Sequence, residues 1–118
     1  MAKIAIMGFG TVGSGVLEVL RKNAASVLKR AGEPVEVKYI LDIRDFSTHP
    51  DAALFVKELD TILDDPEIKV VVETIGGIRP AYSFVTRCLE KGISVVTSNK
   101  AWCSVDGVGK EKQCRFLV

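Results

Sequence analysis

Residues that build covalent or metal-bound scaffolds are scarce in this chain of 118 residues, which has three cysteines and one histidine. An odd number of widely spaced cysteines, Cys88, Cys103 and Cys114, fits neither a disulfide framework nor a paired zinc knuckle. His49 precedes a proline in a polar stretch, and there is no second imidazole to share a metal ion with it. We therefore expect free thiols, no metal site and a reducing, cytoplasmic location.

An excess of one charge is also missing, because 16 lysines and arginines oppose 15 aspartates and glutamates, for a net charge of +1. This balance provides no general attraction to nucleic acid or to an anionic membrane. The first apolar run ends at Gly8, which is too short for a signal peptide or a membrane span. Trp102 has no aromatic partner at a regular spacing, so no stacking platform for nucleobases is expected. Small molecules are the partners that we expect.

Apolar residues, by contrast, make up 47% of the chain, which is enough for one hydrophobic core. A length near the usual size of a single domain predicts one folded unit over residues 1–118. Apolar runs that stop at glycines or polar residues alternate with segments of helical periodicity. Residues 51–59 fit a helix or a strand equally well. The predicted strands are 3–8, 35–41, 70–75 and 93–97.

Two longer helices are predicted between these strands. The first runs without a break over residues 12–28 and stops at Gly32, and the second begins at Pro80 and is capped by Gly92. A single further turn is predicted with Asp60 as its cap. Because strands and helices alternate over short connections, parallel βαβ units are favoured. The predicted fold class is α/β: a doubly wound, mostly parallel sheet of Rossmann type with helices on both faces, in three layers.

A glycine pattern follows the first strand and opens the first helix. Gly8 would allow a tight turn, Gly10 would let the backbone approach a pyrophosphate, and Gly13 would let the helix pack closely on the strand. The start of the helix, at Thr11 and Val12, adds N–H groups and partial positive charge for the phosphates. A turn that merely joins strand to helix is the alternative, but the position between a strand and a helix favours dinucleotide binding.

The residues after the second strand are candidates for recognising the ribose of the adenosine half. Asp42 could accept hydrogen bonds from both ribose hydroxyls, which favours NAD, whereas Arg44 could pair with a 2′-phosphate, which favours NADP. Asp42 could also close an Asx-turn with no role in binding. The residues themselves leave NAD and NADP open.

Two later strand ends carry further candidates, because ligands of open parallel sheets lie across the carboxyl ends of the strands. Gly76 and Gly77 could bring the backbone close to the cofactor, or could form only a strand-to-helix turn. Ser98, Asn99 and Lys100 follow the last clear strand, where the nicotinamide half should lie. The Lys100 ammonium could stabilise or protonate a carbonyl oxygen as hydride arrives, or could simply be solvated.

Three motifs follow one another along the chain: Ile4-Ala-Ile-Met-Gly-Phe-Gly-Thr-Val-Gly-Ser-Gly15, the run from Leu63 to Gly77, and Val95-Val-Thr-Ser-Asn-Lys-Ala101. In this order they resemble the amino-terminal nucleotide-binding domain of homoserine dehydrogenase. Together they extend over residues 1 to about 101, and three motifs are far more specific than the glycine pattern alone.

The resemblance implies NAD(P)-dependent interconversion of L-aspartate 4-semialdehyde and L-homoserine, on the route to threonine, methionine and isoleucine. It implies that Lys100 is a catalytic lysine near the nicotinamide and that Arg44 meets the 2′-phosphate of the cofactor. Gly8, Gly10 and Gly13 correspond to the phosphate loop. Members of the family carry a second, substrate-binding domain that also forms a homodimer.

Within the atypical tail, residues 102–118, the segment 102–109 departs from the family pattern, whereas residues 110–118 again resemble a helix end and the next strand of the family. The family continues after Ala101 with a helix rich in alanine and leucine, whereas this chain reads Trp-Cys-Ser-Val-Asp-Gly-Val-Gly109. The substrate domain would lie beyond this atypical tail and is absent from the chain, so we expect cofactor binding with little or no turnover. Rival hypotheses are a regulatory nucleotide-sensing module, another NAD(P)-dependent dehydrogenase and a truncated product without function.

Overall fold

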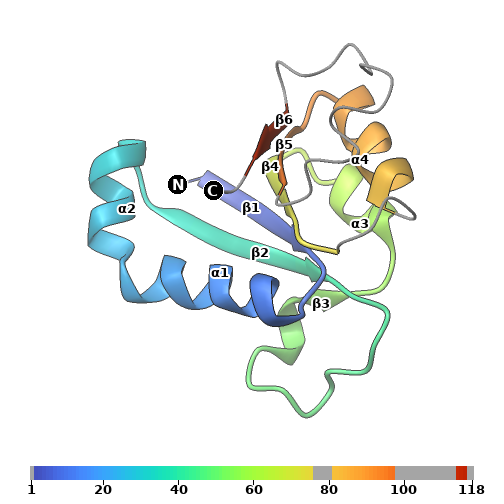
Figure 1. Ribbon diagram of the computed structural model, residues 1–118, viewed down its shortest axis with the longest axis horizontal. Helices are drawn as coiled ribbons and strands as arrows, with labels where there is room; N and C mark the ends of the chain where they lie inside the picture. The colour runs from blue at the N-terminus through green and yellow to red at the C-terminus, as the bar shows by residue number, and fades with distance from the viewer. Residues whose placement is uncertain (1, 76–80, 98–113, 117–118) are drawn as a thin grey trace.

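A parallel sheet forms the centre of the protein in the computed structural model, which describes residues 2–75, 81–97 and 114–116 (Figure 1). The described strands form one six-stranded sheet in the order β3-β2-β1-β4-β5-β6, and every neighbouring pair is parallel. The strands are β1 (Ala2–Met7), β2 (Val35–Leu41), β3 (Phe55–Val56), β4 (Ile68–Glu73), β5 (Ser94–Thr97) and β6 (Cys114–Phe116). The helices are α1 (Thr11–Lys22), α2 (Ala24–Ala31), a 3-10 turn (Ala52–Leu54), α3 (Leu59–Leu63) and α4 (Ala81–Glu90).

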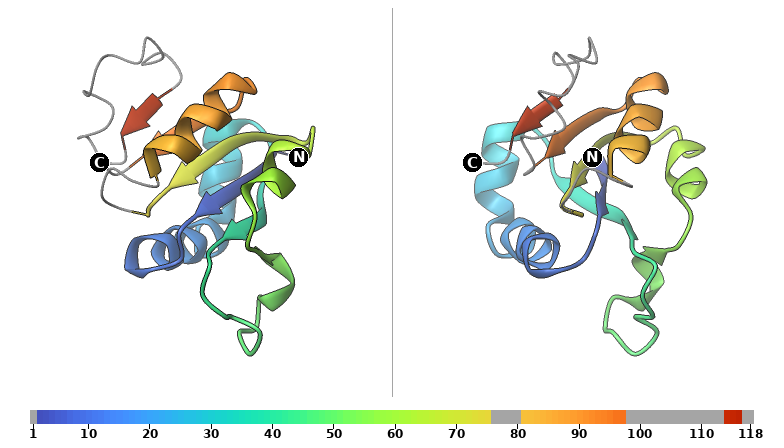
Figure 2. Two further views of the ribbon diagram at one scale, coloured as in Figure 1. Left: turned by 90° about the vertical axis from the view of Figure 1, so that its right-hand side faces the viewer. Right: turned by 45° about the vertical axis from the view of Figure 1, so that its right-hand side comes forward.

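Helices cover both faces of this sheet, as the three views of the ribbon show (Figures 1 and 2). Side chains of a strand alternate between its two faces, and β1 follows this rule. Ile4 and Ile6 pack with Leu17 of α1, whereas Ala5 and Met7 pack on the opposite face with α3 and α4. The three-layer, doubly wound α/β fold predicted from the sequence is therefore confirmed.

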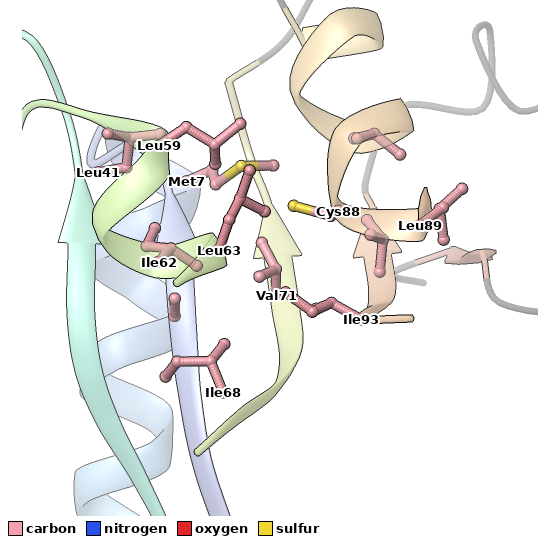
Figure 3. Close-up of a cluster of buried hydrophobic side chains, with 13 residues drawn as sticks. Met7, Leu41, Leu59, Ile62, Leu63, Ile68, Val71, Cys88, Leu89 and Ile93 are labelled. Atoms are coloured by element: carbon pink, nitrogen blue, oxygen red, sulfur yellow. The ribbon is translucent and has the colours of Figure 1, made fainter. Parts of the chain in front are cut away.

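The larger of the two cores lies between the sheet and the helices α3 and α4 (Figure 3). Ile62 of α3 and Val71 of β4 are both fully buried there. Cys88 of α4 lies in the same core as a free thiol, and its burial raises the pKa of the thiol to about 11. The free thiol expected at this position is confirmed, whereas Cys103 lies outside the described residues.

Two local expectations are wrong. The first helix is broken at Asn23, where φ of −112° and ψ of 32° leave helical geometry, so α1 and α2 are separate helices. Asparagine is a weak helix former, and no residue of α2 is buried to hold one straight helix together. Asp60 does not cap α3, because Glu58 occupies the N-cap position and Asp60 lies in the first turn.

Other boundaries agree closely with the sequence. Gly32 and Gly92, both with φ of 81°, follow the ends of α2 and α4 in the left-handed conformation. The ambiguous residues 51–59 contain both a 3-10 turn and the short strand β3. Within the described ranges, no helix is long and apolar enough to cross a membrane.

A partly buried ion pair between Lys38 and Asp65 joins β2 to the turn before β4. Tyr39 donates a hydrogen bond of 2.8 Å to Asp65, and the Lys38 ammonium lies 2.5 Å from the same carboxylate oxygen. The backbone N–H of Glu67 donates to the other oxygen at 2.9 Å. The Lys38 ammonium, together with the Glu67 N–H and the Tyr39 hydroxyl, lowers the pKa of Asp65 from 3.8 to about 2.

This lowered pKa predicts a defined loss of stability in acid. A carboxyl group with a pKa lowered by folding stabilises the protein above its unfolded pKa and loses that contribution as the pH falls through its folded pKa. Urea unfolding of wild type and Asp65→Asn should therefore differ in free energy by a constant amount above about pH 5. The difference should shrink between pH 3.8 and about 2. Asp64→Asn, at an exposed neighbouring carboxylate, is the control and should keep the acid profile of wild type. A pH-independent difference for Asp65→Asn would contradict this assignment.

Candidate functional site

A cleft of about 350 Å³ lies beyond the carboxyl ends of β1, β2 and β4. This is the edge at which open parallel sheets bind their ligands. Most of its lining comes from three connections, which are the loop before α1, the loop after β2 and the first residues after β4, and the end of β2, the residue after β3 and α4 add one residue each. The lining residues are Gly8, Phe9, Gly10, Leu41, Asp42, Ile43, Arg44, Lys57, Thr74, Ile75 and Phe84.

The glycine pattern forms the loop between β1 and α1, as predicted. Gly8 has φ of +94°, a conformation that only glycine adopts without strain. A Cβ atom on Gly13 would lie 2.1 Å from the Gly8 carbonyl oxygen, so the helix start packs directly on the loop backbone. A Cβ atom on Gly10 would meet nothing within 4 Å, and the position therefore stays open toward the cleft.

The start of α1 presents N–H groups at this loop. The first hydrogen bond of the helix runs from the Ser14 N–H to the Gly10 carbonyl oxygen at 2.9 Å. The N–H groups of Thr11, Val12 and Gly13 therefore precede the helical ladder and have no partner within it. Gly10 itself, at the N-cap, supplies no capping side chain. A phosphate group fits such a helix start, because the N–H groups and the helix dipole both favour negative charge.

Asp42 follows β2 directly, and its side chain is only 7% exposed. One oxygen accepts a 2.9 Å hydrogen bond from the Phe9 N–H, and the other accepts the Arg44 N–H at 2.9 Å, which closes the Asx-turn considered above. The Arg44 guanidinium adds two further bonds, of 3.0 and 2.7 Å. Arg44, with the two backbone N–H groups, lowers the pKa of Asp42 to about 2, so the carboxylate stays charged.

Arg44 and its neighbours form the outer wall of the cleft. The Arg44 side chain is 58% exposed, and its guanidinium lies 5.3 Å from the centre of the Phe46 ring. Ile43 is 83% exposed and leaves an apolar surface at the cleft. Lys57, which the sequence reasoning missed, adds a second cation to the lining. Lys57 follows β3, and the ambiguous pattern of residues 51–59 concealed that this strand joins the sheet beside β2.

An aromatic cluster holds the loop that carries Arg44. The rings of Phe46 and Phe55 stack with centroids 4.4 Å apart, and Phe9 of the glycine loop contacts both edge to face. His49 joins this cluster, and its Nδ1 atom accepts a 3.0 Å hydrogen bond from the Asp51 N–H. No group of metal-ligating side chains occurs among the described residues. His49 thus packs as an aromatic ring in the loop.

A buried carboxyl group joins the ends of β4 and β5. Glu73 and Thr97 are both fully buried, and the Thr97 hydroxyl donates a 2.7 Å hydrogen bond to Glu73. The Ile75 N–H donates to the other carboxyl oxygen at 3.1 Å. Sequence reasoning treated Glu73 only as a strand residue, because a lone glutamate at a strand end does not reveal its cross-strand partner.

The remaining candidates cannot be placed in this cleft. Gly76, Gly77, Ser98, Asn99 and Lys100 lie outside the described residues. The structure therefore brings together in one cleft the glycine loop, Asp42 and Arg44, the residues that were predicted to contact the adenosine and phosphates.

Comparisons with known proteins all point to one family. The family model described as "Homoserine dehydrogenase, NAD binding domain" matches residues 8–114. The homoserine dehydrogenase of Pseudomonas aeruginosa is 40% identical over 106 residues, and that of Lactococcus lactis subsp. lactis is 37% identical over 110 residues. A crystal structure of a homoserine dehydrogenase from Thiobacillus denitrificans superposes with a TM-score of 0.83 at 32% identity, over 97% of this chain and 28% of that one.

These relatives are much longer than this chain. The matches cover 89% and 88% of this chain but only 24% and 26% of the Pseudomonas and Lactococcus enzymes. The chain thus spans about a quarter of the length of the curated relatives it matches.

The two glycines of the loop should respond differently to a methyl group. Gly13→Ala should lower the free energy of unfolding by about 2 kcal/mol or more, because its Cβ atom would overlap the Gly8 carbonyl oxygen. Gly10→Ala should cost less than about 1 kcal/mol, since its Cβ atom enters open space. Urea unfolding of both variants measures the contrast, and equal losses would contradict the packing described for Gly13.

Proposed function

Since the chain belongs to the family of homoserine dehydrogenase NAD-binding domains, we propose that residues 1–118 form the cofactor domain of an enzyme that interconverts L-homoserine and L-aspartate 4-semialdehyde. Family membership supports binding of NAD or NADP. The cleft at the glycine loop fits such a cofactor, because it combines an open Gly10 with helix-start N–H groups that have no partner within the helix.

We propose further that NADP is the preferred cofactor, and the Asp42–Arg44 pair is the observation that carries this proposal. A carboxylate offers about four acceptor positions, and four hydrogen bonds from Phe9 and Arg44 already fill those of Asp42. The two ribose hydroxyls of NAD would have to displace the Arg44 guanidinium. A 2′-phosphate would instead bind the exposed face of this guanidinium, with Lys57 as a second cation in the same cleft.

With the 2′-phosphate at Arg44, the positions of the other parts of the cofactor can also be proposed. The pyrophosphate would lie at the N–H groups of Thr11, Val12 and Gly13, and the adenosine would pack against the exposed Ile43. Gly76, Gly77, Ser98 and Asn99 stay proposed contacts of the nicotinamide half. The bound nicotinamide would supply the hydride acceptor or donor of the reaction.

The remaining roles rest on the family resemblance. We propose that Lys100 is the catalytic residue, whose ammonium binds the carbonyl oxygen of the semialdehyde and supplies its proton as the alcohol forms. A substrate domain, a homodimer built through it and a cytoplasmic location are proposals on the same basis.

Removal of the Arg44 guanidinium tests the proposed cofactor preference. Arg44→Ala should weaken NADP binding about tenfold or more, because a charge-assisted hydrogen bond to phosphate is lost. The same change frees acceptor positions on Asp42, so the affinity for NAD should stay equal or increase. Isothermal titration calorimetry with each cofactor at one fixed salt concentration measures both effects.

Arg30→Ala is the matched control, because it removes the same charge from the exposed end of α2. It should change neither affinity by more than about twofold. An equal loss of NAD and NADP affinity in Arg44→Ala would show that Arg44 does not recognise the 2′-phosphate. Failure of wild type to bind either cofactor would overturn the proposed function itself.

A further inference from the structure

One peptide unit of the glycine loop is held from both sides by neighbouring strands. The Phe9 N–H donates to Asp42, which follows β2. The carbonyl oxygen at the other end of this unit belongs to Gly8 and accepts a 2.8 Å hydrogen bond from the hydroxyl of Thr74, which follows β4. The Gly8–Phe9 peptide plane is thus fixed by side chains that lie on opposite sides of β1 in the sheet.

The Thr74 hydroxyl is directed mainly at Gly8. It has a single proton and lies 2.8 Å from the Gly8 oxygen and 3.1 Å from the Met7 oxygen. The Met7 oxygen already accepts the Thr74 N–H at 2.9 Å, whereas no backbone N–H of the described residues donates to the Gly8 oxygen. The hydroxyl therefore gives the Gly8 carbonyl the partner that the sheet does not provide.

Close packing leaves this carbonyl little room to turn. A Cβ atom on Gly13 would lie 2.1 Å from the Gly8 oxygen and 2.9 Å from the Thr74 hydroxyl oxygen. The start of α1, the Gly8 carbonyl and Thr74 are therefore in mutual contact. A tilt of the Gly8–Phe9 peptide would move the loop residues that lead into α1.

We propose that Thr74 is a positioning residue for the phosphate-binding loop. Its hydroxyl fixes the Gly8–Phe9 peptide and thereby orients the N–H groups at the start of α1 toward the pyrophosphate of the cofactor. This inference rests on the proposed function, that the cleft binds NADP. Thr74 contributes through the Gly8 backbone, so its effect belongs to the pyrophosphate and not to the 2′-phosphate end held by Arg44.

Valine at position 74 separates the hydroxyl from the shape of the side chain. It replaces the hydroxyl with a methyl group, and a carbon atom approaches a carbonyl oxygen only to about 3.3 Å, which is farther than the 2.8 Å of the hydrogen bond. The Gly8 carbonyl would lose its partner and be displaced. Serine at position 74 keeps the hydroxyl and should preserve the loop.

The test compares two ligands that share the adenosine 2′-phosphate but differ in the pyrophosphate. Thr74→Val should weaken NADP binding about tenfold, and adenosine 2′-monophosphate binding should change less than about twofold. Thr74→Ser should bind NADP as wild type does. Calorimetry on the 118-residue chain measures both ligands, and thermal unfolding checks that each variant is folded. If valine prevents folding, Thr74→Ala makes the same comparison without the enlarged contact.

Thr86→Val is the matched control, because the Thr86 hydroxyl donates a 2.8 Å bond to a backbone carbonyl within α4, outside the cleft lining. It should bind both ligands as wild type does. The inference is overturned if Thr74→Val binds NADP normally, or if it loses both ligands equally, as a general loss of the site would require. A wild-type chain that binds neither ligand would overturn the proposed function and this inference with it.

Discussion

The orientation of a single peptide unit, Gly8–Phe9, decides the shape of the cleft. Its N–H donates to Asp42 and its carbonyl oxygen accepts the hydroxyl of Thr74, so both strands beside β1 hold it. Gly13 packs on the same carbonyl. Because the unit joins strand to helix, these contacts set the direction in which α1 begins. The conformation of the glycine loop therefore depends on residues that follow β2 and β4 as well as on its own residues.

Asp42 connects the two halves of the proposed cofactor site. One carboxylate both holds the loop at Phe9 and binds Arg44, and its pKa of about 2 keeps it ionised at any pH near neutrality. The carboxylate that holds the glycine loop thus also holds the guanidinium in the lining of the cleft. A change of cofactor preference at Arg44 would therefore also alter the hydrogen bonds around the carboxylate that holds the loop.

Much of the fold could be predicted from local patterns, and the errors have physical reasons. Apolar runs located the four longer strands, and the helix ends at Gly32 and Gly92 follow from left-handed backbone. Periodicity gave no warning of the break at Asn23, because apolar residues on both sides keep a helical spacing. Residues such as Lys57 and Glu73 were missed, because the contacts of a residue at a strand end depend on which strand lies beside it, and local sequence does not show that.

The sequence by itself determined the class of protein: its glycine pattern, strand alternation and three motifs sufficed for the family and for a dinucleotide site. Only the tertiary structure decided what individual side chains do there. Thr74 is 66 residues from Gly8 along the chain, and their contact exists because β4 lies beside β1. From the sequence, Asp42 could bind the ribose hydroxyls of the cofactor or close an Asx-turn. Only the folded arrangement shows that its oxygens accept hydrogen bonds from Phe9 and Arg44. Local patterns report backbone conformation, whereas hydrogen-bond partners depend on which strands become neighbours.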